Sequence, residues 1–128
     1  MIVVDTSALV EIALAAPRAQ DCRRALVEAD QLLISAGTVT ETLIVSLGRD
    51  VEPQMTAILD RFGMTVTPLT EERAKAAGHA YRRYGKGWHP AGLNFGDCFA
   101  YALAKEHDCP LLFVGEDFAK TDVKAALA

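Results

Sequence analysis

The chain begins with MIVVDTSALV (residues 1–10), and this stretch decides the fold class. Its β-branched run from Ile2 to Val4 carries no alternating polar residue, which is typical of a strand buried on both faces. Asp5 stops the run, and residues 6–15 continue with the spacing of a helix. A buried strand followed at once by a helix predicts a parallel sheet that is covered by helices.

The same alternation of short apolar strands and helices continues along the chain. Further strands are expected at residues 32–36, 65–69 and 111–114. Helices are expected to begin near Pro17, Thr38, Pro53, Thr70 and Asn94, and a final helix near Thr121. This order predicts an α/β fold, a three-layer α/β/α sandwich with a central parallel sheet. No linker or repeat interrupts the 128 residues, so a single domain spanning residues 1–128 is expected.

Apolar spacing also indicates which face of each helix turns toward the core. The expected inward residues of the helix after Thr38 are Val39, Leu43, Ile44 and Leu47. In the helix over residues 94–107, Phe95 and Phe99 are expected to fix the helix in the core. Gly96, between them, would leave room for a close approach of another element.

The charge balance is acidic, with a net charge of −4 and a pI of about 5.3. Domains that bind nucleic acid are often basic, so a polyanionic ligand would need a local basic patch or a bound cation. No apolar run approaches the roughly 20 residues of a membrane span, and the N-terminus lacks the basic start of a signal peptide, so a cytoplasmic protein is expected. Cys22, Cys98 and Cys109 form no CxxC pair and predict neither a disulfide framework nor a zinc site.

Four acids stand where strands end or helices begin: Asp5, Glu41, Asp97 and Asp117. Most have a local explanation in helix capping. Asp5 can cap the helix that follows it. Thr38 and Glu41 match the S/T-x-x-E capping box. Asn94 can cap a helix whose first turn holds Asp97, where the helix dipole favours an anion.

Taken together, the four acids predict a site. The carboxyl ends of parallel strands lie at one edge of the sheet, so the acids are expected to meet there. Carboxylates that meet repel one another, and protonation or a bound cation must offset the repulsion. Oxygen ligands without paired His or Cys favour Mg²⁺ or Mn²⁺. Such an ion lowers the pKa of a bound water and neutralises charge on a phosphate during in-line displacement.

Four blocks of the sequence resemble the PIN-domain ribonucleases and, among them, the VapC-type toxins of type II toxin–antitoxin pairs: VVDTSALV, TVTETLI, LNFGDCFAYALA and LLFVGEDFAKTDV. The resemblance implies a sandwich fold whose acidic cluster binds Mg²⁺ or Mn²⁺ and cleaves RNA. It gives the metal-binding and catalytic roles to Asp5, Glu41, Asp97 and Asp117. It also implies a homodimer and a VapB-like antitoxin that covers the site.

The same resemblance gives supporting roles to neighbours of the acids. Ser7 would orient a carboxylate or the scissile phosphate, and Thr6 and Asn94 would support the cluster. Two acids adjoin in GEDF, and the acid of this family directly precedes the Phe. Asp117 is therefore preferred to Glu116, which stays open as a solvated residue or a secondary ligand.

The segment YRRYGKGWH (residues 81–89) mixes basic and aromatic side chains and leads toward Asp97. Basic groups contact phosphates and aromatic rings stack on unpaired bases. RNA contact is therefore predicted for Arg82, Arg83, Lys86 and Trp88. Alternatively, the two arginines form a solvated helix face and Trp88 packs on the core or on a second subunit.

Other functions compete with a nuclease. A catalytically silent PIN-like module would bind RNA or a partner, but all four acids are present, which weighs against a dead site. A receiver-like or phosphatase-like domain would transfer a phosphoryl group, yet a haloacid-type phosphatase needs a second Asp where this chain has Ser7. A structure-specific DNA nuclease carries helical insertions for which the chain lacks room.

Overall fold

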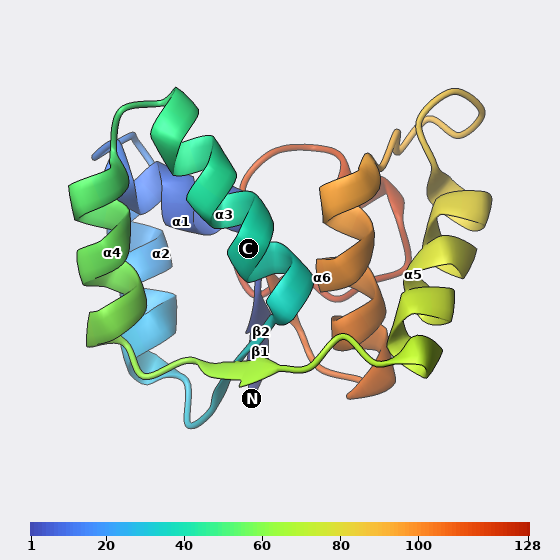
Figure 1. The fold of residues 1–128 in the computed structure, drawn as a ribbon, viewed down its shortest axis with the longest axis horizontal. Coiled ribbons are helices and arrows are strands. Elements are labelled where there is room, and N and C mark those ends of the chain that lie inside the picture. The colour runs from blue at the N-terminus through green and yellow to red at the C-terminus, as the bar shows by residue number, and fades with distance from the viewer.

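A four-stranded parallel sheet forms the middle of the molecule (Figure 1). The computed structural model describes all residues, 1–128. The strands are β1 (Ile2–Val4), β2 (Leu32–Ser35), β3 (Thr65–Thr67) and β4 (Leu111–Leu112). Their order is β3-β2-β1-β4, and Val3 in β1 pairs with Leu33 on one side and Leu111 on the other. Every pairing is parallel, as predicted, so all strands end at the same edge.

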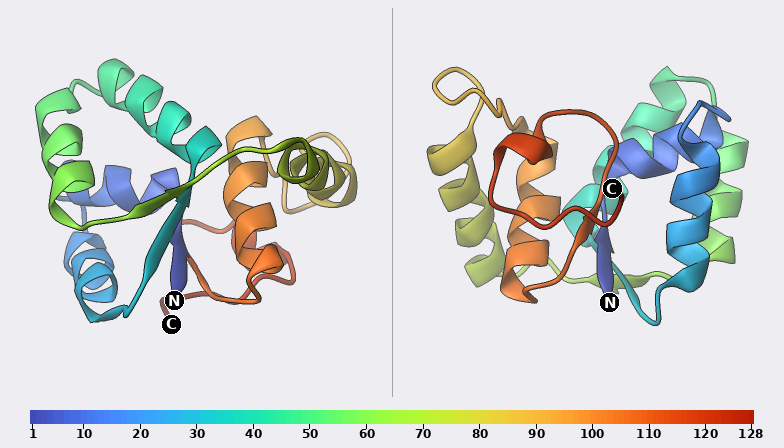
Figure 2. Two further views of the ribbon diagram at one scale, coloured as in Figure 1. Left: turned by 60° about the horizontal axis from the view of Figure 1, so that its bottom comes forward. Right: turned by 180° about the vertical axis from the view of Figure 1, so that it is seen from behind.

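Helices cover both faces of this sheet (Figures 1 and 2). They are α1 (Thr6–Ala13), α2 (Ala19–Glu28), α3 (Ala36–Gly48), α4 (Glu52–Arg61), α5 (Glu71–Tyr84) and α6 (Phe95–Glu106), followed by a 3-10 turn, η1 (Phe118–Lys120). The first, second and fourth helices lie on one side, and α5 and α6 lie on the other. Helix α3 lies between the two groups and contacts α1, α4 and α6. None of these helices has the length and apolarity to cross a membrane.

Successive side chains of each strand point to opposite faces of the sheet and so divide the hydrophobic core into two halves. Val3 and Leu33 pack with Leu103 and its neighbours on the side of α5 and α6. Val4 and Ile34 pack on the opposite side, against α1, α2 and α4. Because successive side chains of a strand point to opposite faces, short all-apolar strands supply both halves at once. The three-layer sandwich predicted from the sequence is confirmed.

The prediction for the inward face of α3 was wrong for three of its four residues; Val39 alone is partly buried and packs against the core. Its buried residues are Thr38, Thr42 and Ser46. The other three side chains expected inside are exposed: Leu43 by 44%, Ile44 by 64% and Leu47 by 62%. The physical reason lies opposite the helix, where Thr6 presents a hydroxyl that hydrogen-bonds the Thr42 hydroxyl at 2.9 Å. A polar neighbour selects a polar helix face, whatever the apolar spacing favours.

The helix predicted from Thr121 is absent. After η1 the chain is extended and lies along the outer edge of β4. The Leu111 amide donates to the Lys124 carbonyl at 2.8 Å, and the Ala126 amide donates to the Leu111 carbonyl at 2.9 Å. The unpaired backbone groups of an edge strand need partners, and this demand outweighs the helical preference of KAALA.

Candidate active site

Asp5 lies directly after β1 and caps α1. Its Oδ2 accepts the Ser7 amide at 3.0 Å and the Ser7 hydroxyl at 2.7 Å. The Ser7 hydroxyl oxygen in turn accepts the Val114 amide at 3.0 Å, which ties the segment after β4 to the end of β1. The capping role predicted for Asp5 is confirmed, but it occupies only one of the two carboxylate oxygens.

The second oxygen of Asp5 has no partner. Oδ1 is buried and accepts no hydrogen bond, and Asp5 as a residue is only 2% exposed. Burial raises the pKa of Asp5 to about 7; the Ser7 hydrogen bonds oppose this rise, and the charges of Asp97 and Glu41 add to it. A buried oxygen without a donor is costly unless a proton or a cation satisfies it.

Glu41 reaches the same place from α3. Its Oε1 accepts a hydrogen bond of 2.6 Å from the Thr6 hydroxyl. The predicted capping box of Thr38 and Glu41 was wrong, because the helix begins at Ala36, where the Ser35 hydroxyl accepts the Gly37 amide at 3.1 Å. Glu41 is therefore free of any capping role and projects from the second turn of α3 toward the acids.

A glycine on α6 makes room for the Glu41 carboxylate. A Cβ placed on Gly96 would overlap the Oε2 atom of Glu41, and one placed on Gly37 would lie 2.7 Å from the Phe99 ring. Both glycines thus permit α3 and α6 to approach closely, as the sequence predicted for Gly96. A larger residue at position 96 would displace the Glu41 carboxylate from the place where it meets Asp5 and Asp97, which we call the acidic corner.

Asp97 closes the corner from the first turn of α6. Its Oδ2 accepts the Asn94 amide at 3.0 Å, and the Asn94 side-chain oxygen accepts the Asp97 amide at 2.9 Å, a reciprocal capping box. Partial burial raises the pKa of Asp97 to about 6, with further increases from the charges of Glu41 and Asp117 and an opposing effect of the Asn94 amide. The Asn94 cap predicted from the sequence is confirmed.

Phe95 does not fix this helix in the core, so that half of the prediction was wrong, whereas Phe99 packs against the core as expected. Phe95 is 78% exposed and packs edge-to-face on the half-buried Phe99, with ring centroids 5.0 Å apart. The buried residues of α6 are Gly96, Cys98, Ala100, Tyr101, Leu103 and Ala104. Phe95 is one position before Gly96 and lies outside the buried face of the helix, whereas Phe99 lies at its margin.

Asp117 lies at the margin of the cluster. It is exposed, directly precedes η1 and makes no side-chain capping bond. It is near enough to Asp97 for its charge to raise the pKa of that residue, whereas Glu116 has no such effect on it. This proximity supports the choice of Asp117 as the fourth acid.

The acids of the corner share a cavity of about 310 Å³ between α1 and α3. It is lined by Asp5, Thr6, Ser7, Val10, Glu11, Glu41, Val45, Arg49, Asp97 and Val114. As the side chains lie, no three His, Cys, Asp or Glu residues form a closed metal cage. Mg²⁺, however, is usually held by one or two carboxylates together with water and substrate phosphate, and an all-oxygen corner with an unpaired buried Asp5 oxygen fits that requirement.

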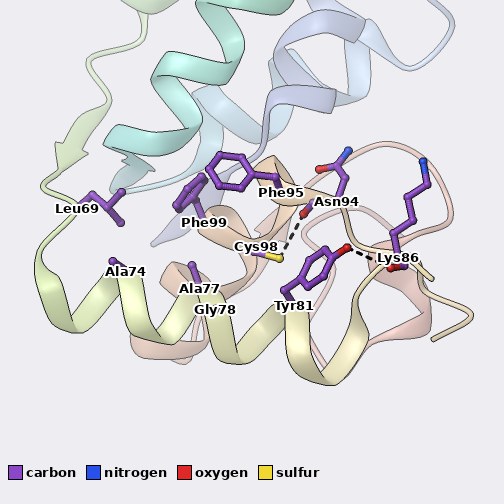
Figure 3. A pocket seen from close by; sticks show the side chains of 10 residues that line it. All are labelled: Leu69, Ala74, Ala77, Gly78, Tyr81, Lys86, Asn94, Phe95, Cys98 and Phe99. Carbon is purple, nitrogen blue, oxygen red and sulfur yellow. Dashed lines mark hydrogen bonds between the residues drawn. The ribbon is translucent and has the colours of Figure 1, made fainter. Parts of the chain in front are cut away.

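The predicted RNA-contact residues lie outside this cavity. Arg83 pairs with Asp122 at 3.4 Å, and the Trp88 indole donates to the Arg82 carbonyl at 2.9 Å. Lys86 lines a neighbouring apolar groove of about 790 Å³ between α5 and α6, shown in Figure 3. Asn94, which caps the helix that carries Asp97, lines the same groove. Contact of these four residues with RNA stays a prediction.

The sequence did not point to five residues of the cavity, and two of these are charged, Glu11 and Arg49. Glu11 lies four positions after Ser7 on α1, and Arg49 lies eight positions after Glu41, one residue beyond the end of α3. Helical spacing from the predicted acids could have indicated both, because positions four and eight apart share a helix face.

Comparison with known proteins identifies relatives over most of the chain. A family model described as "PIN domain" matches residues 2–124. A protein named Ribonuclease VapC from Mycolicibacterium smegmatis is 45% identical over 126 residues, covering 96% of this chain and 98% of the relative. Ribonuclease VapC30 from Mycobacterium tuberculosis is 46% identical over 125 residues, covering 94% and 95% respectively.

Solved structures with low sequence identity share the fold. The crystal structure of Mycobacterium tuberculosis VapC20, described as a sarcin–ricin loop cleaving toxin, matches with a TM-score of 0.78 at 16% identity over 96% of each chain. A toxin–antitoxin complex from Klebsiella pneumoniae matches with a TM-score of 0.70 at 19% identity over 98% of each chain. At this identity the likeness extends to the fold alone.

Proposed function

The chain belongs to the PIN-domain family, and from this premise we propose that it is a divalent-metal-dependent endoribonuclease, the toxin of a VapBC-type toxin–antitoxin pair. The observation that carries the proposal is the unpaired, buried Oδ1 of Asp5 in a corner that also holds Glu41 and Asp97. The ribonuclease names of relatives that are 45–46% identical over nearly the whole chain support it.

The three acids of the corner share one pattern of hydrogen bonding. Ser7 holds Oδ2 of Asp5, the Thr6 hydroxyl holds Oε1 of Glu41, and the Asn94 amide holds Oδ2 of Asp97. In each carboxylate the protein fixes one oxygen and leaves the other without a hydrogen bond. The fixed oxygens orient the side chains before any ligand arrives, which is how rigid sites reduce the cost of binding.

The free oxygens are the proposed metal ligands and water-orienting groups. Asp5 and Asp97 would hold a Mg²⁺ or Mn²⁺ ion, with Glu41 and Asp117 beside it. When bound, this ion supplies a water of lowered pKa and neutralises the charge that develops on the scissile phosphate. Glu41, whose Oε2 faces Gly96 without a donor, would be the proton acceptor of the corner. Ser7 would keep the Asp5 carboxylate aligned during the reaction, and Thr6 would do the same for the Glu41 carboxylate.

Toxicity, inhibition and assembly belong to the same proposal. A VapB-like antitoxin would cover the acidic corner, and the chain would form a homodimer in the cytoplasm, where its RNA substrate is. The solved toxin–antitoxin complex from Klebsiella pneumoniae, whose matching chain has the same fold, supports an antitoxin partner. The identity of the RNA depends on the surface around the corner rather than on the acids themselves.

Cleavage of single-stranded RNA by the purified protein tests the proposal. We expect cleavage with Mg²⁺ or Mn²⁺, loss of activity with EDTA, and a reduction of more than about 100-fold in Asp97→Asn, because a ligand is lost. Asp60→Asn makes the same change at an exposed position of α4 and should cleave normally. Normal cleavage by Asp97→Asn, or in EDTA, would contradict the mechanism.

The competing interpretation, a catalytically silent binding module, predicts a different result. Such a module would bind RNA or a partner with no cleavage in any metal. Expression of the toxin alone should also arrest growth, and co-expression of a small gene adjacent to its own should relieve the arrest. Growth arrest that persists in Asp97→Asn would show that toxicity does not depend on cleavage.

A further inference from the structure

The cavity beside the acidic corner is a trough between two helices. One wall comes from α1, with Ser7, Val10 and Glu11, and the other comes from positions 41, 45 and 49 on or just beyond α3. Positions four and eight apart lie on one helix face, so the α3 wall is a continuous stripe that begins at Glu41 and ends at Arg49. The trough therefore leads from the predicted metal-binding acids to an arginine.

Arg49 is the one basic residue among those that line the trough. It is exposed, and its guanidinium forms no ion pair or hydrogen bond in the structure. Arg18, Arg24, Arg73 and Arg83 have carboxylate partners, whereas Arg23, Arg61 and Arg82, like Arg49, have none but lie outside the trough. An arginine that lies next to acids and yet binds none of them retains all of its donors for another anion.

Two acids in the walls of the trough, Glu11 and Glu41, already accept other hydrogen bonds. Glu11 accepts the backbone amide of Arg18 at 2.8 Å, and Glu41 accepts the Thr6 hydroxyl at 2.6 Å. Neither carboxylate forms an ion pair with Arg49. The outer end of the trough therefore carries an available positive charge, whereas its inner end carries the acids.

We propose that Arg49 binds a backbone phosphate of the RNA that flanks the scissile one, an inference that rests on the proposed ribonuclease function. Eight helical residues span about 12 Å along the axis, so Arg49 lies too far from Glu41 to share the same phosphate when its side chain extends outward. A guanidinium matches phosphate oxygens in a bidentate fork. Arg49 thus supplies the local positive charge that an acidic protein needs in order to hold RNA.

The test measures RNA binding separately from cleavage. Asp97→Asn and Asp97→Asn/Arg49→Gln are titrated with a fluorescein-labelled single-stranded RNA of twelve nucleotides over a series of salt concentrations. We expect the second replacement to weaken binding about tenfold, as for loss of a hydrogen bond to a charged group. The slope of log affinity against log salt should also fall by roughly 0.7, the value for one phosphate contact on a single strand.

Two further variants control for charge and geometry. Arg24→Gln, in the same background, removes an equal charge from α2, where the side chain is 65% exposed and outside the trough, and should change affinity less than twofold. Arg49→Lys should give an intermediate affinity, because it keeps the charge but loses the fork. In the wild-type background, Arg49→Gln should raise KM for RNA more than it lowers kcat.

Several outcomes would overturn the inference. Unchanged affinity and salt slope in Arg49→Gln would do so, as would equal losses in Arg49→Gln and Arg24→Gln. A lower melting temperature with unchanged RNA affinity would assign Arg49 a structural role, and weaker binding of the antitoxin alone would assign it to that partner. Absence of cleavage by the wild-type protein would instead count against the proposed function, while the binding comparison could still be made.

Discussion

The carboxylate of Asp122 and the carboxylates of the acidic corner lie in opposite environments. Near the C-terminus, Asp122 accepts the Tyr101 hydroxyl and pairs with Lys105 at 3.3 Å and Arg83 at 3.4 Å. The Tyr101 hydrogen bond, with further help from the two cations, lowers the pKa of Asp122. At the acidic corner no cation approaches within ion-pair distance, and burial raises the pKa of Asp5 to about 7 and that of Asp97 to about 6.

This difference separates a structural acid from a candidate functional one. The partners of Asp122 are all in the chain, so its charge holds the C-terminal segment to α5 and α6. No basic side chain of the protein pairs with Asp5 or Asp97. Burial of these carboxylates therefore costs free energy until a proton or a bound cation neutralises them. Four predictions test this contrast, from the largest effect to the smallest.

The arrangement of acids in the corner depends on the close packing of α3 and α6, and Gly96→Ala should disrupt this packing. The new Cβ would occupy the position of Glu41 Oε2, so we expect RNA cleavage to fall by more than about 100-fold. Gly78→Ala is the matched control, because a Cβ there meets nothing within 4 Å and α5 should tolerate it. Far-UV circular dichroism would verify that both variants fold. Equal cleavage by the two would refute the assigned contact.

Cleavage should depend on pH through the two acids with raised pKa. Both Asp5 and Asp97 must be ionised to bind a cation, so we expect activity to fall more than tenfold from about pH 8 to about pH 5. Higher Mg²⁺ should shift the midpoint to lower pH, because the cation competes with the protons. A midpoint that does not respond to Mg²⁺ would show that other groups control the profile.

Asp5→Asn should stabilise the metal-free protein while it abolishes cleavage. The pKa of Asp5 is about 7 in the folded state and about 3.9 in an unfolded chain, so the folded state binds more protons between these values. Stability from this group is present at low pH and is lost as pH rises through that window. We expect denaturant unfolding in EDTA at about pH 8 to show a gain of about 1–3 kcal/mol in the free energy of unfolding, which shrinks near pH 4.

A loss of stability at both pH values would show that the capping hydrogen bonds of Asp5 outweigh its burial cost. The comparison must be made without metal, because a bound cation stabilises the wild type alone.

Asp122→Asn should have the smallest effect and the opposite sign. Its lowered pKa means that it contributes stability above the unfolded pKa of about 3.9 and loses it as pH falls. Its side chain is 37% exposed, so solvent screens the ion pairs and we expect a loss of only about 1 kcal/mol at neutral pH, reduced by salt. Unfolding in urea at two salt concentrations measures it. Impaired cleavage in this folded variant would contradict the separation of Asp122 from the acidic corner.

Local sequence signals predicted much of the framework. The sequence was enough to predict the strand before Asp5, the Asn94 cap and the order of strands and helices. These signals are local, because capping residues, β-branched runs and turn residues act within a few positions. The parallel sheet followed from strands without polar alternation. Their places at strand ends and helix starts singled out the four acids, and the resemblance to a family gave them roles; the structure brings three of them into one cavity with the fourth nearby.

Only the tertiary structure decided the faces and the contacts. The apolar residues of α3 predicted one inward face, but the polar neighbour Thr6 selected the other. The segment after Thr121 could form a helix, but it is extended and hydrogen-bonds to the open edge of β4 through an isolated bridge between Leu111 and Ala125. The stripe from Glu41 to Arg49 became a wall only because α1 lies opposite. The spacing of residues along a helix indicates which of them share a face. The element packed against the helix determines which face is buried and which face forms a site.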